Sequence, residues 1–175
     1  MTARDIVNDY SESELYRVIR DYGEDRFAKN IAKHIVAERT KGPIETTGQL
    51  NEIISHAIPM KIQKTSGHPS KRTFQALRIE LNHELDVLRD TLDDMIDLLN
   101  PGGRLCIITF HSLEDRMVKN IMKTGNVEGK AEKDFYGNVQ TPFRLVNNKV
   151  IVPDEEEIAR NPRSRSAKLR IAEKR

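Results

Sequence analysis

Polar side chains gather at the end of a short apolar run in the second half of the chain. The run is Leu105–Ile108, and the segment Phe110–Arg116 that follows it carries an imidazole, a hydroxyl, two carboxylates and a guanidinium. Polar groups placed where a core strand ends usually face a ligand in open α/β folds. The segment therefore predicts a ligand site, with His111 and Ser112 as its candidate reactive groups.

Glu114 and Asp115 have two interpretations that the sequence leaves open. Acidic side chains are favoured in the first turn of a helix, and a helix is expected to begin here. The same two carboxylates could equally take part in the chemistry of the site.

Hydrolytic and metal chemistry find little support. Adjacent residues in a strand point to opposite faces, so His111 and Ser112 do not form a nucleophile pair, and no elbow motif surrounds the serine. Glu80 and His83 have the spacing of two ligands on one helix face, but a di-metal carboxylate bundle needs a second such motif, which the sequence lacks. No metal site is predicted.

The elements around the polar segment follow from apolar spacing. A continuous apolar run predicts a strand over residues 104–110, buried on both faces and entered through the turn Pro101–Gly103. Helical spacing then predicts a helix over residues 112–123. Upstream, an apolar stripe from Phe74 to Leu99 predicts one long helix that packs on the sheet. A coiled coil would use the same stripe, but a strand follows too closely to favour it.

The remainder of this α/β domain, residues 68–175, is expected to contain shorter elements. Segments 143–146 and 149–152 resemble two strands around an Asn-Asn turn. A short helix is predicted over Asp154–Arg160, after a connection without clear period. A final strand over residues 167–172 would complete the edge of the sheet.

Residues 1–67 predict a small helical domain that precedes the α/β domain. Ser11 and Glu14 form a capping-box pattern at the start of one helix. A second helix is expected over residues 24–38, and Thr46 or Thr47 can cap a third. A loop over residues 61–67 then leads into the long helix.

Composition limits the class of protein. The chain has 175 residues, of which 32% are charged and 37% hydrophobic, enough for one domain or two small ones. One cysteine, Cys106, allows no internal disulfide and indicates a reducing compartment. No stretch has membrane-spanning length, and the N-terminus lacks a signal-peptide pattern. A cytoplasmic protein without a membrane partner is expected.

The formal net charge of +2 hides an asymmetry along the chain. Residues 80–97 carry seven carboxylates against one arginine, as on a solvated helix face, whereas residues 161–175 carry six basic side chains against one glutamate. In the predicted final strand, Lys168 and Arg170 share one face, which suits phosphate contacts that give affinity without sequence readout. Solubility alone is the other explanation of this basic end.

Four segments, in this order along the chain, resemble motifs of one known family. They are Tyr22–Ala28, His68–Ile79, Phe110–Arg116 and Asn161–Ala172. The family is that of the bacterial 16S ribosomal RNA cytidine N4-methyltransferases, also called small-subunit methyltransferase H or MraW-like. The resemblance covers nearly the whole chain, least over Thr124–Lys149, but only the C-terminal portion of such an enzyme. It implies the C-terminal part of a doubly wound methyltransferase sheet, with residues 1–67 corresponding to a helical substrate-recognition insertion.

The resemblance implies S-adenosylmethionine as methyl donor, but the main binding motif is absent from this sequence. Nucleotide sites on such sheets need a glycine-rich turn after a strand, whereas Gly102-Gly103, the only adjacent glycine pair, precedes one. We therefore expect no cofactor-binding residue in this chain, a cofactor half encoded upstream of Met1, and little activity in isolation. A truncated reading frame, a deliberately shortened protein and one part of a split protein would all give this pattern.

The resemblance also implies the partner, which is small-subunit ribosomal RNA or the small ribosomal subunit. His111 and Ser112 are then the catalytic candidates, as hydrogen-bonding groups near the target base. The candidate RNA-binding residues are Tyr10, Lys71, Arg72, Arg78, Phe110, Arg116, Arg163, Arg165, Lys168 and Arg170. For Lys71, Arg72 and Arg78, holding the helical domain against the sheet is an equally supported role.

The competing function is a non-enzymatic RNA-binding or ribosome-assembly module derived from such an enzyme. A sheet edge left where upstream strands should pair would also favour a homodimer. Binding of S-adenosylmethionine by the chain would distinguish these possibilities.

Overall fold

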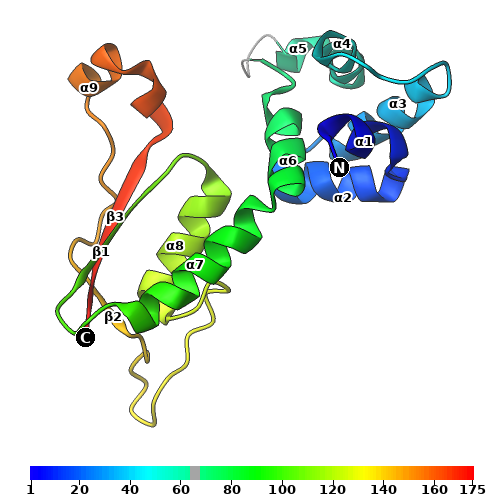
Figure 1. The fold of residues 1–175 in the computed structure, drawn as a ribbon. Helices are drawn as coiled ribbons and strands as arrows, with labels where there is room; N and C mark the ends of the chain where they lie inside the picture. Colours follow the sequence, from blue (N-terminus) through cyan, green and yellow to red (C-terminus); the bar gives the residue numbers. More distant parts are fainter. Residues whose placement is uncertain (64–67) are drawn as a thin grey trace. The chain divides into compact units, whose positions relative to one another are not determined.

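The chain forms two compact units, Met1–Glu84 and Leu85–Arg175. The computed structural model describes residues 1–63 and 68–175 (Figure 1). The sequence places the domain boundary between residues 67 and 68, beside the segment 64–67 that lies outside the described residues, whereas the observed division falls between Glu84 and Leu85. Part of the predicted connecting loop is helical, because Met60–Gln63 forms α5.

The N-terminal unit is all-helical in its described part. Its helices are α1 (Ala3–Asp9), α2 (Glu12–Gly23), α3 (Ala28–Arg39), α4 (Thr47–Ala57), α5 (Met60–Gln63) and α6 (Lys71–Asn82). The capping box of Ser11 and Glu14 is confirmed, and Thr46 rather than Thr47 caps α4. The predicted second helix begins later than expected, at Ala28, because Arg26 and Phe27 form a turn. Helix α1, capped by Thr2, was not predicted.

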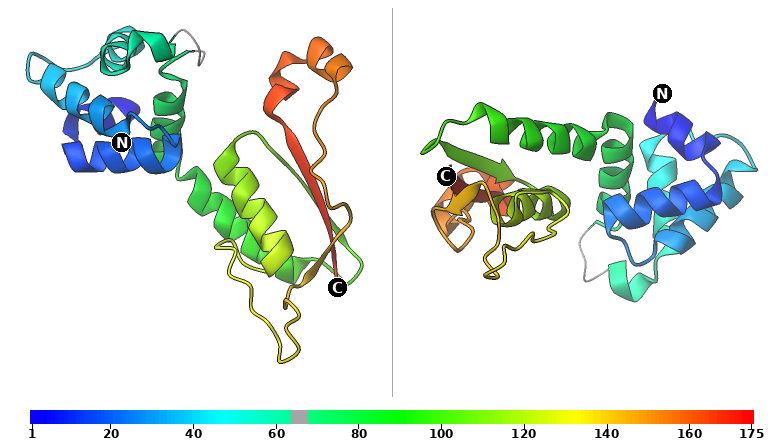
Figure 2. Two further views of the ribbon diagram at one scale, coloured as in Figure 1. Left: turned by 180° about the vertical axis from the view of Figure 1, so that it is seen from behind. Right: turned by 90° about the horizontal axis from the view of Figure 1, so that it is seen from below.

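Apolar residues at helical spacing build one core in this unit. The fully buried large side chains of the cluster are Ile6, Leu15, Ile19, Ile31, Ile35 and Ile54. They come from four helices too short to be stable alone, so the unit depends on packing of their apolar faces against one another. Figure 2 shows these helices from two further sides.

The prediction of one long helix is wrong, because the helix is interrupted at His83. This residue ends α6 in the left-handed conformation, at φ 52°, and α7 (Glu84–Leu98) begins at the next residue. The Arg78 guanidinium spans the break with two hydrogen bonds, of 2.7 and 2.9 Å, to the Glu84 carboxylate. The apolar spacing continues on both sides of His83, which is why the sequence does not reveal the break.

The C-terminal unit is α/β, with a small antiparallel sheet. Its elements are β1 (Arg104–Thr109), α8 (Ser112–Thr124), β2 (Phe143–Leu145), α9 (Glu155–Arg160), a 3-10 helix η1 (Pro162–Ser166) and β3 (Lys168–Lys174), after α7. The strand order is β1-β3-β2, and both pairings are antiparallel. The final strand is therefore central in the described sheet, which corrects its predicted place at the edge.

The predicted hairpin around the Asn-Asn turn is also wrong. Strand β2 pairs with β3, and Ile151 forms a single bridge to Leu169 of β3, so the two segments pair with a strand distant in sequence rather than with each other. Local turn signals could not reveal this long-range choice of partner.

One face of the sheet carries the core of this unit. Leu105 and Ala172 are partners in register, and they pack with Phe143 against apolar side chains of α7 and α8. The alternate side chains of β1 are open to solvent, since Ile108 is 58% exposed and Cys106 is exposed as well. The strand is thus half-buried, which corrects the prediction of burial on both faces: α7 and α8 both lie on the same face.

No helix in the described part of the chain combines the length and apolar character that a membrane span requires.

Close packing of α2 on α6 yields a stability prediction at Gly23. A Cβ added there would lie 2.9 Å from the backbone oxygen of Arg72 and 3.5 Å from Ala76 Cβ. We expect Gly23→Ala to lower the free energy of unfolding by about 1–3 kcal/mol, because backbone must move to admit the methyl group. Urea denaturation of the whole chain measures this.

The matched control is Gly48→Ala in α4, where the nearest atom to an added Cβ is Thr46 Oγ1, at 3.7 Å. Alanine there should raise the free energy of unfolding by about 0.5–1 kcal/mol, the ordinary helix preference. Equal effects of the two substitutions would contradict the close approach of α2 and α6.

Candidate functional site

The predicted site lies at the junction between β1 and α8. Strand β1 ends at Thr109, and His111 occupies the N-cap of α8 with extended backbone. The His111 Nδ1 atom accepts a hydrogen bond of 3.4 Å from the backbone N–H of Glu114. In return, the Glu114 carboxylate accepts from the backbone N–H groups of Phe110 and His111, at 2.9 and 3.2 Å. This is a capping box in which histidine takes the usual place of serine or threonine.

The capping role sets the chemistry of the His111 ring. Because Nδ1 accepts a hydrogen bond, the neutral ring carries its proton on Nε2. The side chain is 9% exposed, and Nε2 has no aligned hydrogen-bond partner among the described residues, although Glu114 Oε1 lies 3.3 Å away. His111 therefore holds a buried donor whose hydrogen bond is not satisfied within this part of the chain.

Glu114 is the ionised half of the cap. Burial raises the pKa of its carboxyl, but the contact with the His111 ring and the backbone N–H of Phe110 outweigh burial, so the pKa lies below its ordinary value. The structure thus supports the helix-start interpretation of Glu114, because its oxygens are occupied by backbone donors.

Two neighbours of His111 point outward. The Phe110 side chain is 54% exposed, which is high for an aromatic ring next to a buried histidine. Ser112, the first residue of α8, is exposed as well. The junction therefore presents a ring and a hydroxyl to solvent beside the buried His111 donor.

Asp115 binds the central strand rather than the junction. It is 8% exposed, and its carboxylate accepts hydrogen bonds from Arg170 Nε and Nη2 at 2.7 and 3.1 Å and from Lys168 Nζ at 3.3 Å. Burial raises the pKa of Asp115, but Arg170 and then Lys168 outweigh it, so the pKa lies below its ordinary value. Lys168 and Arg170 do share a face of β3, as predicted, and both are engaged in this internal ion pair.

The other basic residues near the C-terminus are arranged differently. Arg163 and Arg165 lie in η1 and are exposed, and neither forms an ion pair within the described residues. Arg116 is exposed on α8. Of the basic C-terminal segment, the exposed cations are therefore Arg163 and Arg165 on η1 and the terminal Arg175, and none lies on a strand of the sheet.

Two candidates in the N-terminal unit have internal partners. The Tyr10 hydroxyl donates to Glu80 Oε1 at 3.0 Å, and Arg17 donates to the same oxygen at 2.8 Å. Burial, followed by the hydrogen bond to Glu80, raises the pKa of Tyr10. Arg78 pairs with Glu84 across the helix break. The Glu80 and His83 pattern is thereby explained by structure, since one accepts these hydrogen bonds and the other ends α6.

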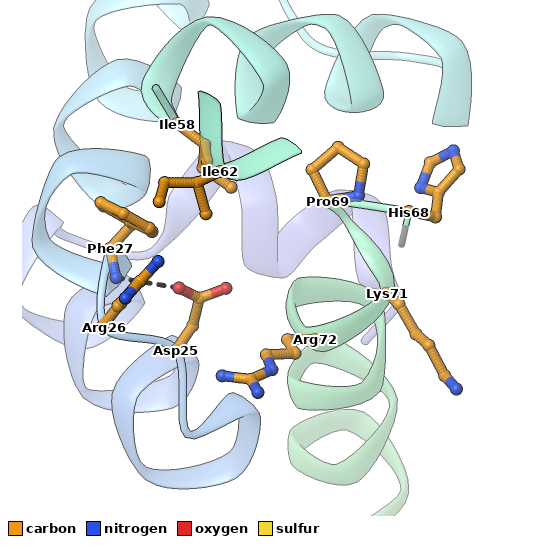
Figure 3. A pocket seen from close by; sticks show the side chains of 9 residues that line it. All are labelled: Asp25, Arg26, Phe27, Ile58, Ile62, His68, Pro69, Lys71 and Arg72. Atoms are coloured by element: carbon orange, nitrogen blue, oxygen red, sulfur yellow. Dashed lines mark hydrogen bonds between the residues drawn. The ribbon is translucent and has the colours of Figure 1, made fainter. Parts of the chain in front are cut away.

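Lys71 and Arg72 instead line a pocket in the N-terminal unit. The pocket has a volume of about 260 Å³. Its lining residues are Asp25, Arg26, Phe27, Ile58, Ile62, His68, Pro69, Lys71 and Arg72 (Figure 3). Two of the sequence motifs, around Asp25 and around Lys71, thus line the same pocket. They are distant in sequence, so the sequence alone does not reveal that they are neighbours.

One loop carries two exposed aromatic rings. Its sequence shows no clear helical or strand periodicity. Phe135 and Tyr136 are 98% and 86% exposed and contact each other edge to face, with ring centroids 5.7 Å apart. Asp134 orders the loop, because its carboxylate accepts from the backbone N–H groups of Tyr136 and Asn138. The sequence Asp-Phe-Tyr-Gly could have been used to predict this turn.

Comparison with known proteins agrees with the family resemblance of the sequence motifs. The model of the MraW methylase family matches residues 1–175. "Ribosomal RNA small subunit methyltransferase H 2" of Agathobacter rectalis is 64% identical over 99% of this chain and 56% of its own length. "Ribosomal RNA small subunit methyltransferase H" of Bacteroides fragilis is 58% identical, and that of Clostridioides difficile 51% identical, each over 99% of this chain. The chain spans about half the length of these relatives.

The buried Asp115 pair generates a prediction on stability and its pH dependence. Asp115→Asn should lower the free energy of unfolding by about 2–4 kcal/mol at neutral pH, because Arg170, whose side chain is only 18% exposed, is left without its counter-charge. With a lowered folded pKa, Asp115 stabilises the fold above its unfolded pKa of about 3.9 and ceases to do so as the pH falls through the folded value. The loss of stability between about pH 5 and about pH 2 should therefore be smaller in the variant.

Glu173→Gln, on the strand that carries Arg170, is the matched control. Glu173 pairs with Arg104 and Arg144, whose side chains are 63% and 70% exposed, so its removal should lower the stability much less than the removal of the Asp115 charge. Urea denaturation across the pH range measures both variants. A neutral effect of Asp115→Asn would show that the ion pair does not hold α8 to β3.

Proposed function

Because the chain belongs to the MraW methylase family, we propose that it forms part of an S-adenosylmethionine-dependent enzyme that methylates N4 of a cytidine in small-subunit ribosomal RNA, in the decoding region. The observation that carries the proposal is the 64% identity, over almost the whole chain, to a protein named as a small-subunit ribosomal RNA methyltransferase. The choice of N4 and of the decoding region rests on the four sequence motifs. The cytoplasm is the proposed location, where small-subunit RNA is found.

The N-terminus of α8 does not have the features of a nucleotide-binding helix start that would suit S-adenosylmethionine. The N-terminus of α8 follows a strand, as a nucleotide-binding helix would, but no glycine lies between β1 and α8, and the Glu114 carboxylate already occupies the N–H groups of Phe110 and His111. A second anionic or polar ligand cannot take those donors. We propose that the cofactor binds to residues that correspond to the part of the relatives that this chain does not span.

The residues of the junction suit the positioning of a base. The target amine must be aligned and desolvated, and holding it in place supplies much of the rate of such a reaction. Enzymes that modify a base take it out of its stack. We propose that the exposed Phe110 ring stacks on the displaced cytosine. His111 Nε2–H and the Ser112 hydroxyl would then hydrogen-bond its polar edge.

This role for His111 is donation, not proton abstraction. Its Nδ1 lone pair is committed to the backbone N–H of Glu114, so the ring offers a proton rather than a free basic nitrogen at the site. The Nε2 donor is buried and lacks an aligned partner within the described residues, and a hydrogen bond from the substrate would satisfy it.

Contacts with the RNA backbone are assigned to the exposed cations. We propose Arg163 and Arg165 of η1 and Lys71 and Arg72 of α6 for this role. Tyr10, Arg78, Lys168 and Arg170 are less suitable, because each already contacts a carboxylate of the chain. Those four side chains would support the surface rather than contact the phosphates.

A non-enzymatic RNA-binding or assembly module is the second candidate function. The observation that favours it is the closed N-terminus of α8, where the Glu114 carboxylate already accepts from backbone N–H groups that a nucleotide ligand would use. A separate observation concerns the sheet. One edge of β1 pairs with no strand of the described sheet, so a second copy or the remaining half of a longer protein could pair there.

A chimera tests the proposed reaction. In it, these 175 residues replace the matching segment of the Agathobacter rectalis relative, which supplies the remaining half. We expect the chimera to convert cytidine to N4-methylcytidine in small-subunit RNA, as measured by mass spectrometry of the digested nucleosides. RNA binding without methylation, while the intact relative is active, would favour the non-enzymatic function, and methylation at another atom would contradict the N4 assignment.

Within the chimera, His111→Asn separates capping from positioning. Asparagine is a good N-cap, so the free energy of unfolding should change by less than about 0.5 kcal/mol. The methylation rate should nevertheless fall about 10–100-fold, because the Nε2 donor is lost. His56→Asn makes the same change at an exposed position of α4 and should leave the rate unaltered. Full activity of His111→Asn would show that His111 serves only as a helix cap.

A further inference from the structure

The pocket of the N-terminal unit has an excess of positive charge. Arg26, His68, Lys71 and Arg72 contribute basic side chains to its lining, whereas Asp25 contributes the only carboxylate among the lining residues. The Asp25 carboxylate is buried, and its Oδ1 accepts a hydrogen bond of 2.8 Å from the backbone N–H of Phe27 (Figure 3). This carboxylate is therefore already engaged in ordering the turn that leads into α3.

The cations of the pocket are held without carboxylate partners. Arg26 lies over the Phe27 ring, at 4.8 Å from its centroid, and Arg72 donates to the backbone oxygen of Glu24 at 2.9 Å. Neither they nor Lys71 form an ion pair within the described part of the chain. Both arginines are thus oriented by contacts that leave their charge uncompensated, and a concave site of one sign attracts ions of the other.

Two helices add to the same potential. Helices α3 and α6 begin at the pocket, and their N-caps, Phe27 and Ser70, make no side-chain capping hydrogen bond. The first N–H groups of a helix are unpaired within it and favour negative charge nearby. Their contribution reinforces the basic side chains, which are the principal feature of the pocket.

Size and shape restrict the ligand. The volume of 260 Å³ is below the range of about 300–1,000 Å³ that suits whole cofactors and drug-sized molecules. Four lining residues are apolar, namely Phe27, Ile58, Ile62 and Pro69. A compact anion with an attached carbon framework matches this combination of a basic wall and an apolar wall.

We propose that this pocket binds a phosphate of the RNA backbone together with its adjoining sugar. The inference rests on the proposed function and deepens it, because it assigns a specific phosphodiester site to Arg26, Lys71 and Arg72. A backbone contact of this kind carries no sequence information but sets the register of the RNA on the protein. The site would therefore hold the strand in place while another part of the protein selects the base.

The test compares RNA binding by the whole 175-residue chain and by Arg26→Gln/Lys71→Gln. Fluorescence anisotropy measures the affinity for a decoding-region RNA and for an RNA of scrambled sequence at several salt concentrations. We expect the variant to bind both RNAs about tenfold more weakly and to reduce the slope of log affinity against log salt by about 0.7–1, the value for one lost phosphate contact. Lys29→Gln/Lys33→Gln removes the same charge from exposed positions of α3 outside the pocket and should leave the slope unchanged.

Titration with inorganic phosphate at constant ionic strength gives an independent measurement. The backbone amide signals of Ala28, Lys71 and Arg72 should shift in the NMR spectrum of the chain and should not shift in the double variant. If that variant unfolds, Lys71→Gln alone, which changes an exposed side chain, should reduce both the salt slope and the phosphate response.

The outcomes separate this inference from the proposed function. RNA binding whose affinity and slope are unaltered in Arg26→Gln/Lys71→Gln would overturn the pocket as an RNA site and leave the methyltransferase proposal intact. Amide shifts with phosphate but no change in RNA binding would equally overturn it, because the phosphate would come from a small molecule. Absence of RNA binding by the unmodified chain would count against the proposed function itself.

Discussion

The ion pair between Asp115 and Arg170 determines how the C-terminal unit presents its candidate site. Asp115 lies in the first turn of α8, and Arg170 lies on β3, the strand that pairs with both of the others. The pair is mostly buried, and Lys168 joins it from the same face of the strand. Because the start of α8 is held to the centre of the sheet, the residues just before it, Phe110 and His111, have a defined orientation at the end of β1.

The two carboxylates of this turn therefore have separate structural tasks. Asp115 anchors the helix to the sheet, and Glu114 closes the helix end by accepting from two backbone N–H groups. With both carboxylates occupied, the buried Nε2 donor of His111 is the group of this turn that has no aligned hydrogen-bond partner among the described residues. The same closure explains why the N-terminus of α8 offers no free N–H groups at Phe110 and His111 to an anion, although the strand-to-helix connection resembles a nucleotide site in outline.

Local patterns in the sequence predict local structure well in this chain. The capping boxes at Ser11 and Thr46 and the apolar spacing of α2, α4 and α8 are set by neighbours within one or two turns. The break at His83 escapes the same reasoning, because a single left-handed residue leaves the apolar spacing unchanged. Pairing of β2 with β3 and of Asp115 with Arg170 depends on contacts between distant segments, which no local pattern contains. The junction could be found from sequence, whereas the basic pocket required Asp25 and Lys71 to be brought together in space.

Basic residues that look alike in the sequence have different environments in the structure. Lys168, Arg170 and Arg78 neutralise carboxylates within their own units, whereas Arg163 and Arg165 are exposed without ion pairs in the described part of the chain. Charge composition alone therefore overstates the surface that can contact phosphates.

The central proposal is that this chain supplies residues that face the RNA while the methyl donor is held elsewhere. Isothermal titration calorimetry with S-adenosylmethionine tests it most directly, on the 175-residue chain and on the chimera with the Agathobacter rectalis relative. We predict saturable binding by the chimera and none by the chain alone. Micromolar binding by the chain alone would contradict the proposal, because the methyl donor would then have its site among these residues.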